Sequence, residues 1–141
     1  FKIPVGGGAA VRLADAGFNP VWSPRGDLIL YAGGGIRGLS PLRAITPDGE
    51  PVDIPAIRLS AGGERFRFVP DGSGLLYMQG GFIEQNFWLL DFATKQSRQV
   101  TQFTKTDTMR TFDVTPDGAT IVFDRLRQNS DIVLIDLPQE P

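Results

Sequence analysis

The sequence predicts an all-β fold, a β-propeller of about three blades with four antiparallel strands in each blade. Two observations predict it: an internal repeat of constant length, and frequent turn residues that leave little room for long helices. The chain has 17 glycines and 11 prolines among 141 residues, about a fifth of the total, against an average usage of about 12%. No segment shows the 3.6-residue hydrophobic periodicity of an amphipathic helix over helical length.

The repeat consists of three segments that align without gaps around a proline: Pro24, Pro70 and Pro116. Successive copies are therefore 46 residues apart. Proline holds φ at about −65° for the second position of a type I turn, and the glycine two residues later supplies a positive φ. Short apolar runs follow each turn, as β-hairpins require. A further turn at residues 46–49 falls half a period after the first. One period thus contains four short strands, as one propeller blade does.

This repeat divides the chain, which we treat as a single partial propeller domain over residues 1–141. The expected parts are the end of a preceding blade (1–13), two blades (18–59 and 64–103) and an incomplete last blade (110–137). Three blades are too few to close a ring. We therefore expect half of a six-bladed ring, either cropped from a longer chain or completed by a second copy. In the second case, residues 10–13 of the partner copy would add the missing fourth strand of the last blade.

Two positions of the repeat are expected to pack between neighbouring blades. One of them is occupied by Trp22, Phe68 and Val114, and the other by Pro20, Phe66 and Phe112.

The turn motif resembles the TolB-like family of WD-like β-propeller repeats. Its copies here are Trp22-Ser23-Pro24-Arg25-Gly26, Phe68-Val69-Pro70-Asp71-Gly72 and Val114-Thr115-Pro116-Asp117-Gly118. The ending, residues 121–136, is similar to the last blade of bacterial propellers that follow a serine/threonine kinase domain. The resemblance implies a non-enzymatic module for protein or ligand binding, the C-terminal part of a larger bacterial protein. It also leaves open an accessory or sensor propeller of an enzyme such as a kinase or a peptidase. It favours a periplasmic or extracytoplasmic location.

Composition argues against several classes of function. The chain has no histidine and no cysteine, so the Ser-His-Asp triad, the Cys-His dyad and cysteine- or histidine-ligated metals are excluded. We predict no catalytic residue, no cofactor and no metal. The net charge of −2 does not favour nucleic acid, and no apolar run is long enough for membrane insertion. Residues 33–38 match G-x-G-x-x-G, but a strand and not a helix is expected after them, which indicates a loop.

The candidate binding residues lie near the start of the first strand of a repeat. Arg67 and Asp113 occupy the same repeat position, and Arg65 and Arg110 are close to them in sequence. One interpretation is a polar channel mouth that binds an anionic peptide end or a small ligand through arginine. The other is an ion pair between Arg67 and Asp113 that links two blades. Phe82 is the candidate for an exposed aromatic contact with a partner protein.

Overall fold

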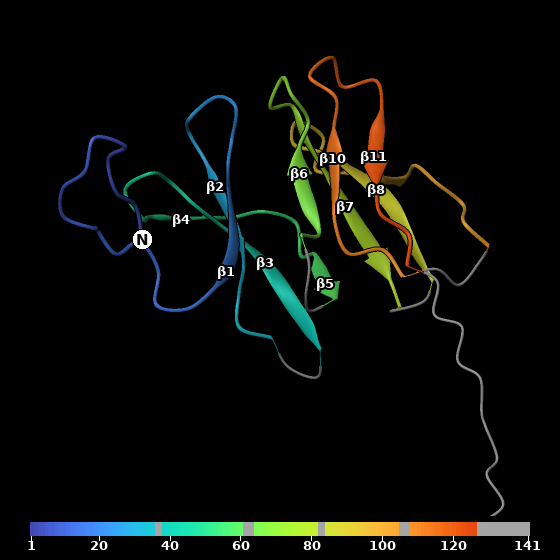
Figure 1. The fold of residues 1–141 in the computed structure, drawn as a ribbon, viewed down its shortest axis with the longest axis horizontal. Helices are drawn as coiled ribbons and strands as arrows, with labels where there is room; N and C mark the ends of the chain where they lie inside the picture. Colours follow the sequence, from blue (N-terminus) through green and yellow to red (C-terminus); the bar gives the residue numbers. More distant parts are fainter. Residues whose placement is uncertain (36–37, 61–63, 82–83, 105–107, 127–141) are drawn as a thin grey trace, which may run out of the picture.

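The computed structural model describes residues 1–35, 38–60, 64–81, 84–104 and 108–126, which contain eleven strands and no helix. The strands form three antiparallel sheets that follow one another in chain order (Figure 1). The all-β prediction is therefore confirmed for this part of the chain. No described helix is long and apolar enough to cross a membrane.

The first sheet has five strands where the repeat predicts four. They are β1 (Phe18–Trp22), β2 (Ile29–Ala32), β3 (Leu39–Ile45), β4 (Pro51–Val52) and β5 (Arg58–Ser60). The strands β1 to β4 pair in order, and both β4 and β5 pair with β3 at its opposite ends. The expected fourth strand is thus split in two. Pro55 lies in the break, and a proline has no N–H to donate to the neighbouring strand.

The second sheet has the four predicted strands in sequential order: β6 (Phe66–Phe68), β7 (Gly74–Gly80), β8 (Gln85–Asp91) and β9 (Ser97–Gln99). The third sheet pairs β10 (Phe112–Val114) with β11 (Ile121–Phe123). The rest of the expected last blade, residues 127–137, lies outside the described residues. The expected end of a preceding blade, residues 1–13, contains an isolated antiparallel bridge between Lys2 and Val11 in place of two strands.

All four proline turns form as their residues predict. In each, the glycine N–H donates to the carbonyl three residues earlier, over 2.8–3.0 Å. The four donors are Gly26, Gly49, Gly72 and Gly118, with φ between +70° and +92°. Glycine adopts this left-handed region without the steric cost that a Cβ imposes. The turns at 24, 70 and 116 all lie along the top edge of the molecule in Figure 1.

The sheets stack face to face on two hydrophobic cores. Leu75 and Tyr77 of β7 belong to the core shared with the first sheet, whereas Leu76 and Met78 belong to the core shared with the third. This alternation follows from the two-residue period of a strand. Both faces of the second sheet are buried over residues 74–78 of β7, which form a continuous apolar run, and the run ends at the exposed Gln79.

The two repeat positions expected between sheets differ in burial from copy to copy. Phe66, Phe68 and Phe112 are buried as expected, but Trp22 is 49% exposed and Pro20 is exposed. The reason is positional: both lie on the face of the first sheet that no sheet of the described residues covers.

Residues one repeat period apart contact one another throughout the stack. This places equivalent positions of successive repeats side by side, as stacking of identical units requires. The pairs are Lys2 with Asp48 (3.3 Å), Arg25 with the Asp71 carbonyl (3.1 Å), the Glu64 N–H with the Arg110 carbonyl (2.9 Å), and Arg67 with Asp113 (3.8 Å).

Candidate binding site between β6 and β10

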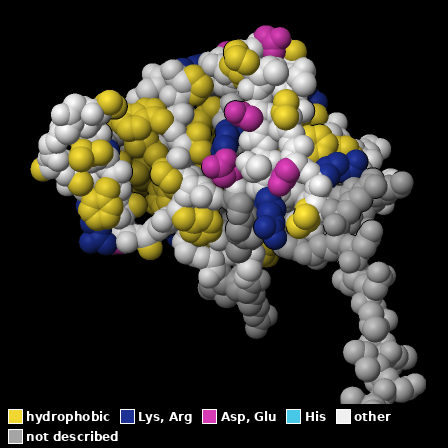
Figure 2. All heavy atoms as spheres, viewed as in Figure 1, with side chains coloured by type: hydrophobic (Ala, Val, Ile, Leu, Met, Phe, Trp, Pro, Cys, Tyr) yellow, Lys and Arg dark blue, Asp and Glu magenta, His cyan; other side chains and the backbone are white. Residues whose placement is uncertain are grey.

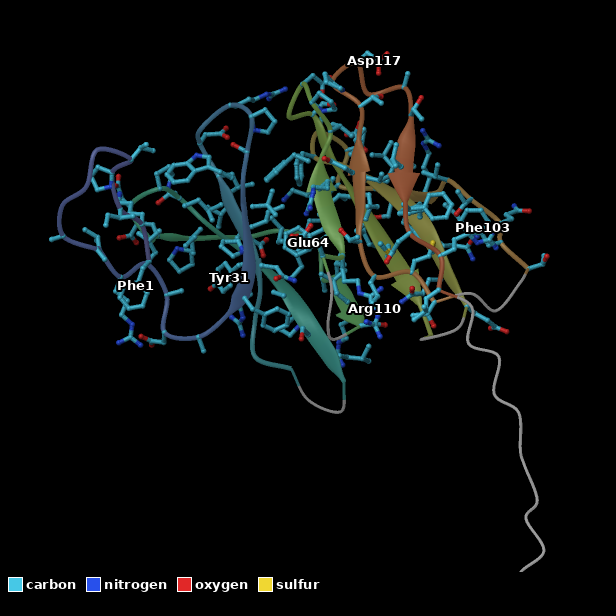
Figure 3. The ribbon with its side chains drawn as sticks, viewed as in Figure 1. Phe1, Tyr31, Glu64, Phe103, Arg110 and Asp117 are labelled. Atoms are coloured by element: carbon cyan, nitrogen blue, oxygen red, sulfur yellow. The ribbon has the colours of Figure 1, made fainter. Side chains whose placement is uncertain are left out.

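A strip of charged side chains lies where the first strands of the second and third sheets run side by side. We call it the charged strip; it consists of Glu64, Arg65, Arg67, Arg110, Asp113 and Asp124. Figure 2 shows basic and acidic side chains next to one another over β6 and β10. Figure 3 places Glu64 at the start of β6 and Arg110 on the segment that enters β10, on the same side of the molecule.

The backbone fixes the two ends of this strip relative to each other. The Glu64 N–H donates to the Arg110 carbonyl over 2.9 Å. The Asp124 carboxylate accepts hydrogen bonds from the N–H groups of Arg110 (2.8 Å) and Thr111 (2.9 Å). Arg110 is therefore held through both its N–H and its carbonyl, so the position of its Cα is well defined.

These hydrogen bonds also explain the acidity of Asp124. Its partial burial alone would raise the pKa of the carboxyl group, because a charge is less stable away from water. The hydrogen bonds from Thr111 and Arg110 outweigh that effect, and the pKa of Asp124 is lowered. The sequence did not single out Asp124 for this site, nor Glu64. For Glu64, the sequence does contain a signal: it lies three residues before Arg67, which is close enough along the chain for the two side chains to pair.

Arg67 is paired with two carboxylates. Its guanidinium contacts Glu64 and lies 3.8 Å from Asp113, and it also donates to the Phe66 carbonyl over 3.1 Å. The Thr111 hydroxyl donates to Glu64 over 3.3 Å. The ion pair between Arg67 and Asp113, one of the two interpretations of the sequence, is present. The positive charge of Arg67 is thus balanced within the protein.

Arg65 is placed differently from the expectation that it contacts a ligand. It is only 3% exposed, and its guanidinium donates to the Met109 carbonyl and to Gln85 Oε1. Burial lowers the pKa of Arg65, with the nearby Asp124 acting in the opposite direction. An incoming peptide cannot reach a guanidinium enclosed in this way. Arg65 instead joins the second sheet to the segment that leads into β10.

Arg110, in contrast to Arg65, is accessible to a ligand. Its side chain is exposed, and none of the ion pairs among the described residues involves it. A guanidinium offers five N–H donors in a planar fork that matches a carboxylate. Beside the strip is a shallow hollow of about 310 Å³, lined by residues that include Glu64, Arg67, Asp113, Val122 and Asp124. Arg110 is not part of this lining; it is next to it in the chain, before Thr111. The site therefore combines one accessible cation with several acceptor oxygens.

Two other predicted features have clear positions. Residues 33–38 connect β2 to β3, so the loop interpretation of the glycine-rich motif is confirmed for those that the structure describes. Phe82 lies outside the described residues. Within the described ranges, no group of three acidic side chains is arranged to hold a metal ion.

No family model and no curated protein matches this chain.

Proposed function

We propose that the three stacked sheets are consecutive blades of a β-propeller and that the chain is a non-enzymatic binding module. The support for the architecture is the set of contacts between residues 46 apart. It agrees with the resemblance of the turn motif to TolB-like repeats. In a propeller, the first strand of every blade borders the central axis. The charged strip on β6 and β10 would then line the mouth of the channel.

The ligand that this site would take is a protein or peptide that carries a carboxylate, either a chain end or an acidic side chain. The observation that supports it is the contrast among the three arginines. Arg65 is buried and Arg67 is neutralised by Glu64 and Asp113, while the Arg110 guanidinium is exposed on a fixed backbone. A bidentate arginine–carboxylate contact is both directional and charge-assisted.

The surrounding carboxylates narrow the choice of ligand. Glu64, Asp113 and Asp124 belong to the same strip as Arg110, and two of them are paired with Arg67. The strip therefore has as many acidic as basic groups and offers no excess of positive charge to a polyanion. A single carboxylate next to a hydroxyl, an amide or a cation would be accepted. This favours a peptide terminus or a mixed-charge peptide over a phosphorylated or nucleic-acid ligand.

The experiment is a titration of the full chain with two pools of short peptides. Binding is monitored by NMR through the chemical shifts of the protein's amide groups. Both pools lack aspartate and glutamate; one has free C-terminal carboxylates and the matched pool has amidated C-termini, so only the first pool carries a carboxylate. The proposal expects shifts around Arg110 with the first pool only. A hydrogen bond to a charged group contributes about 1.5–3 kcal/mol, so Arg110→Ala should weaken binding by about tenfold or more.

The matched control is Arg98→Ala, which removes an exposed arginine from β9, away from the strip. It should bind like the unmodified chain. Equal binding by Arg110→Ala, or equal shifts with the amidated pool, would show that Arg110 does not bind a terminal carboxylate.

A further inference from the structure

An apolar surface remains open on the first sheet, on the side away from the second. We call it the open face; its residues are Pro20 and Trp22, which are exposed, Tyr31, which is half-buried, and Ile29, which is buried but lines the groove described next. A groove of about 430 Å³ lies between this face and the N-terminal segment, where Phe1 and Ile3 add to its apolar lining. Figure 2 shows hydrophobic side chains gathered between the N-terminal segment and β1.

The repeat shows what kind of surface fits there. One period later, the open-face positions are Phe66, Phe68, Leu75 and Tyr77; two periods later they are Phe112, Val114, Ile121 and Phe123. The first of these sets packs against the first sheet, and the second packs against the second sheet. In both cases the partner is the preceding sheet of the stack. The open face is therefore shaped to receive another sheet of the same repeat.

The other end of the stack presents the complementary surface. Val122 on β11 is 62% exposed, whereas its equivalents Leu30 and Leu76 are 0% and 4% exposed. Leu30 and Leu76 are buried in the cores that join their sheets to the next one. We call the Val122 side of the third sheet the forward face. Inside the stack, the forward-face side of each sheet packs against the open-face side of the next sheet. At the two ends of the described stack, one surface of each kind is left exposed.

We propose that the open face receives the forward face of a second copy of this chain, in a head-to-tail arrangement. The inference rests on the stacking of repeat sheets in the proposed function, but not on the binding role of Arg110. Self-association of this type is heterologous, because two different surfaces meet. A net charge of −2 per chain opposes it only weakly at physiological salt.

The test is sedimentation velocity of the full chain over about 1–200 µM, together with two charge-introducing variants. The mass should rise with concentration above the 15.4 kDa of one chain. Trp22→Asp damages the open face and Val122→Asp damages the forward face. Each should weaken association by about thirtyfold or more, the effect of removing a central interface contact. Val100→Asp, an exposed valine after β9 on neither face, is the matched control and should associate normally.

Mixing the two variants decides the arrangement. Trp22→Asp retains an intact forward face and Val122→Asp retains an intact open face, so a head-to-tail contact re-forms in the mixture. Circular dichroism of each variant alone checks that it folds. A chain that stays at 15.4 kDa throughout would overturn the proposal, and so would normal association of Val122→Asp, which indicates contact between two open faces. Val122 lines the hollow beside the charged strip, so peptide binding is compared only between Trp22→Asp and the unmodified chain. Trp22→Asp leaves Arg110 and that hollow unchanged and should bind peptide normally whether or not it self-associates.

Discussion

Replacing the buried arginine by methionine separates a structural role from a ligand-binding role. Arg65→Met keeps an unbranched apolar chain of similar length and removes the guanidinium. In the structure that group donates to Gln85 Oε1 and to the Met109 carbonyl, which lie on β8 and just before β10. The substitution therefore removes two of the polar connections between the second sheet and the segment that leads into β10, and it leaves most of the packing in place.

The size of the effect follows from these partners. Gln85 Oε1 also accepts the Met109 N–H over 3.2 Å, so it keeps one partner in the variant. The Met109 carbonyl loses its charged donor in a buried place. A hydrogen bond to a charged group contributes about 1.5–3 kcal/mol, and a buried group left without a partner adds to the loss. We expect Arg65→Met to lower the free energy of unfolding by about 2–4 kcal/mol.

Urea denaturation followed by tryptophan fluorescence measures this difference, with Arg110→Met as the matched control. Since Arg110 is exposed, its replacement should change the free energy of unfolding by no more than about 0.5 kcal/mol. If Arg65→Met unfolds at the same urea concentration as the unmodified chain, Arg65 has no structural role of this size. Loss of peptide binding in Arg65→Met without loss of stability would instead assign Arg65 to the ligand.

Three further predictions concern packing, turns and pH. Phe87 is fully buried and its ring contacts those of Phe103, Phe112 and Phe123; Phe87→Ala should cost about 3–5 kcal/mol in the same urea assay. Gly118 has φ of +72°, so Gly118→Ala should cost about 1–2 kcal/mol, measured as a drop in midpoint that Gly118→Asn largely avoids. The pKa of Asp124 is lowered in the folded chain, so this carboxyl binds protons more weakly folded than unfolded. Its contribution to stability is present above the unfolded pKa of about 3.9 and is lost as the pH falls through the lower folded value; Asp124→Asn should flatten the decline seen in denaturation curves between pH 6 and pH 2.

Local features of this fold were predictable because their causes are local. Each turn needs only a proline and a glycine two residues later, and both are visible in the sequence. The spacing of 46 also predicted one contact between sheets, Arg67 with Asp113, because equivalent positions of stacked repeats must be neighbours. The first turn has Arg25 at the position where the other three turns have aspartate. This arginine does not disturb the turn, because its side chain points to the neighbouring turn and donates to the Asp71 carbonyl.

Other features depend on several strands at once and have no local signal. The burial of Arg65 is set by Gln85 and Met109, which come from other parts of the chain. The exposure of Trp22 depends on the absence of a covering sheet among the described residues. The equivalent residue of the second repeat, Phe68, is buried. The expected fourth strand is split where Pro55 lies, between β4 and β5. The sequence shows this proline, but only the sheet shows that both parts pair with β3.

Scalar coupling across a hydrogen bond tests the stacking of repeats most directly. In a long-range HNCO spectrum of the deuterated chain, we expect a cross-peak between the Glu64 amide nitrogen and the Arg110 carbonyl carbon, which lie on opposite sides of the 2.9 Å hydrogen bond. The same amide should exchange slowly with solvent. A Glu64 amide that exchanges freely, or that couples to a carbonyl of its own sheet, would contradict the side-by-side placement of residues one period apart.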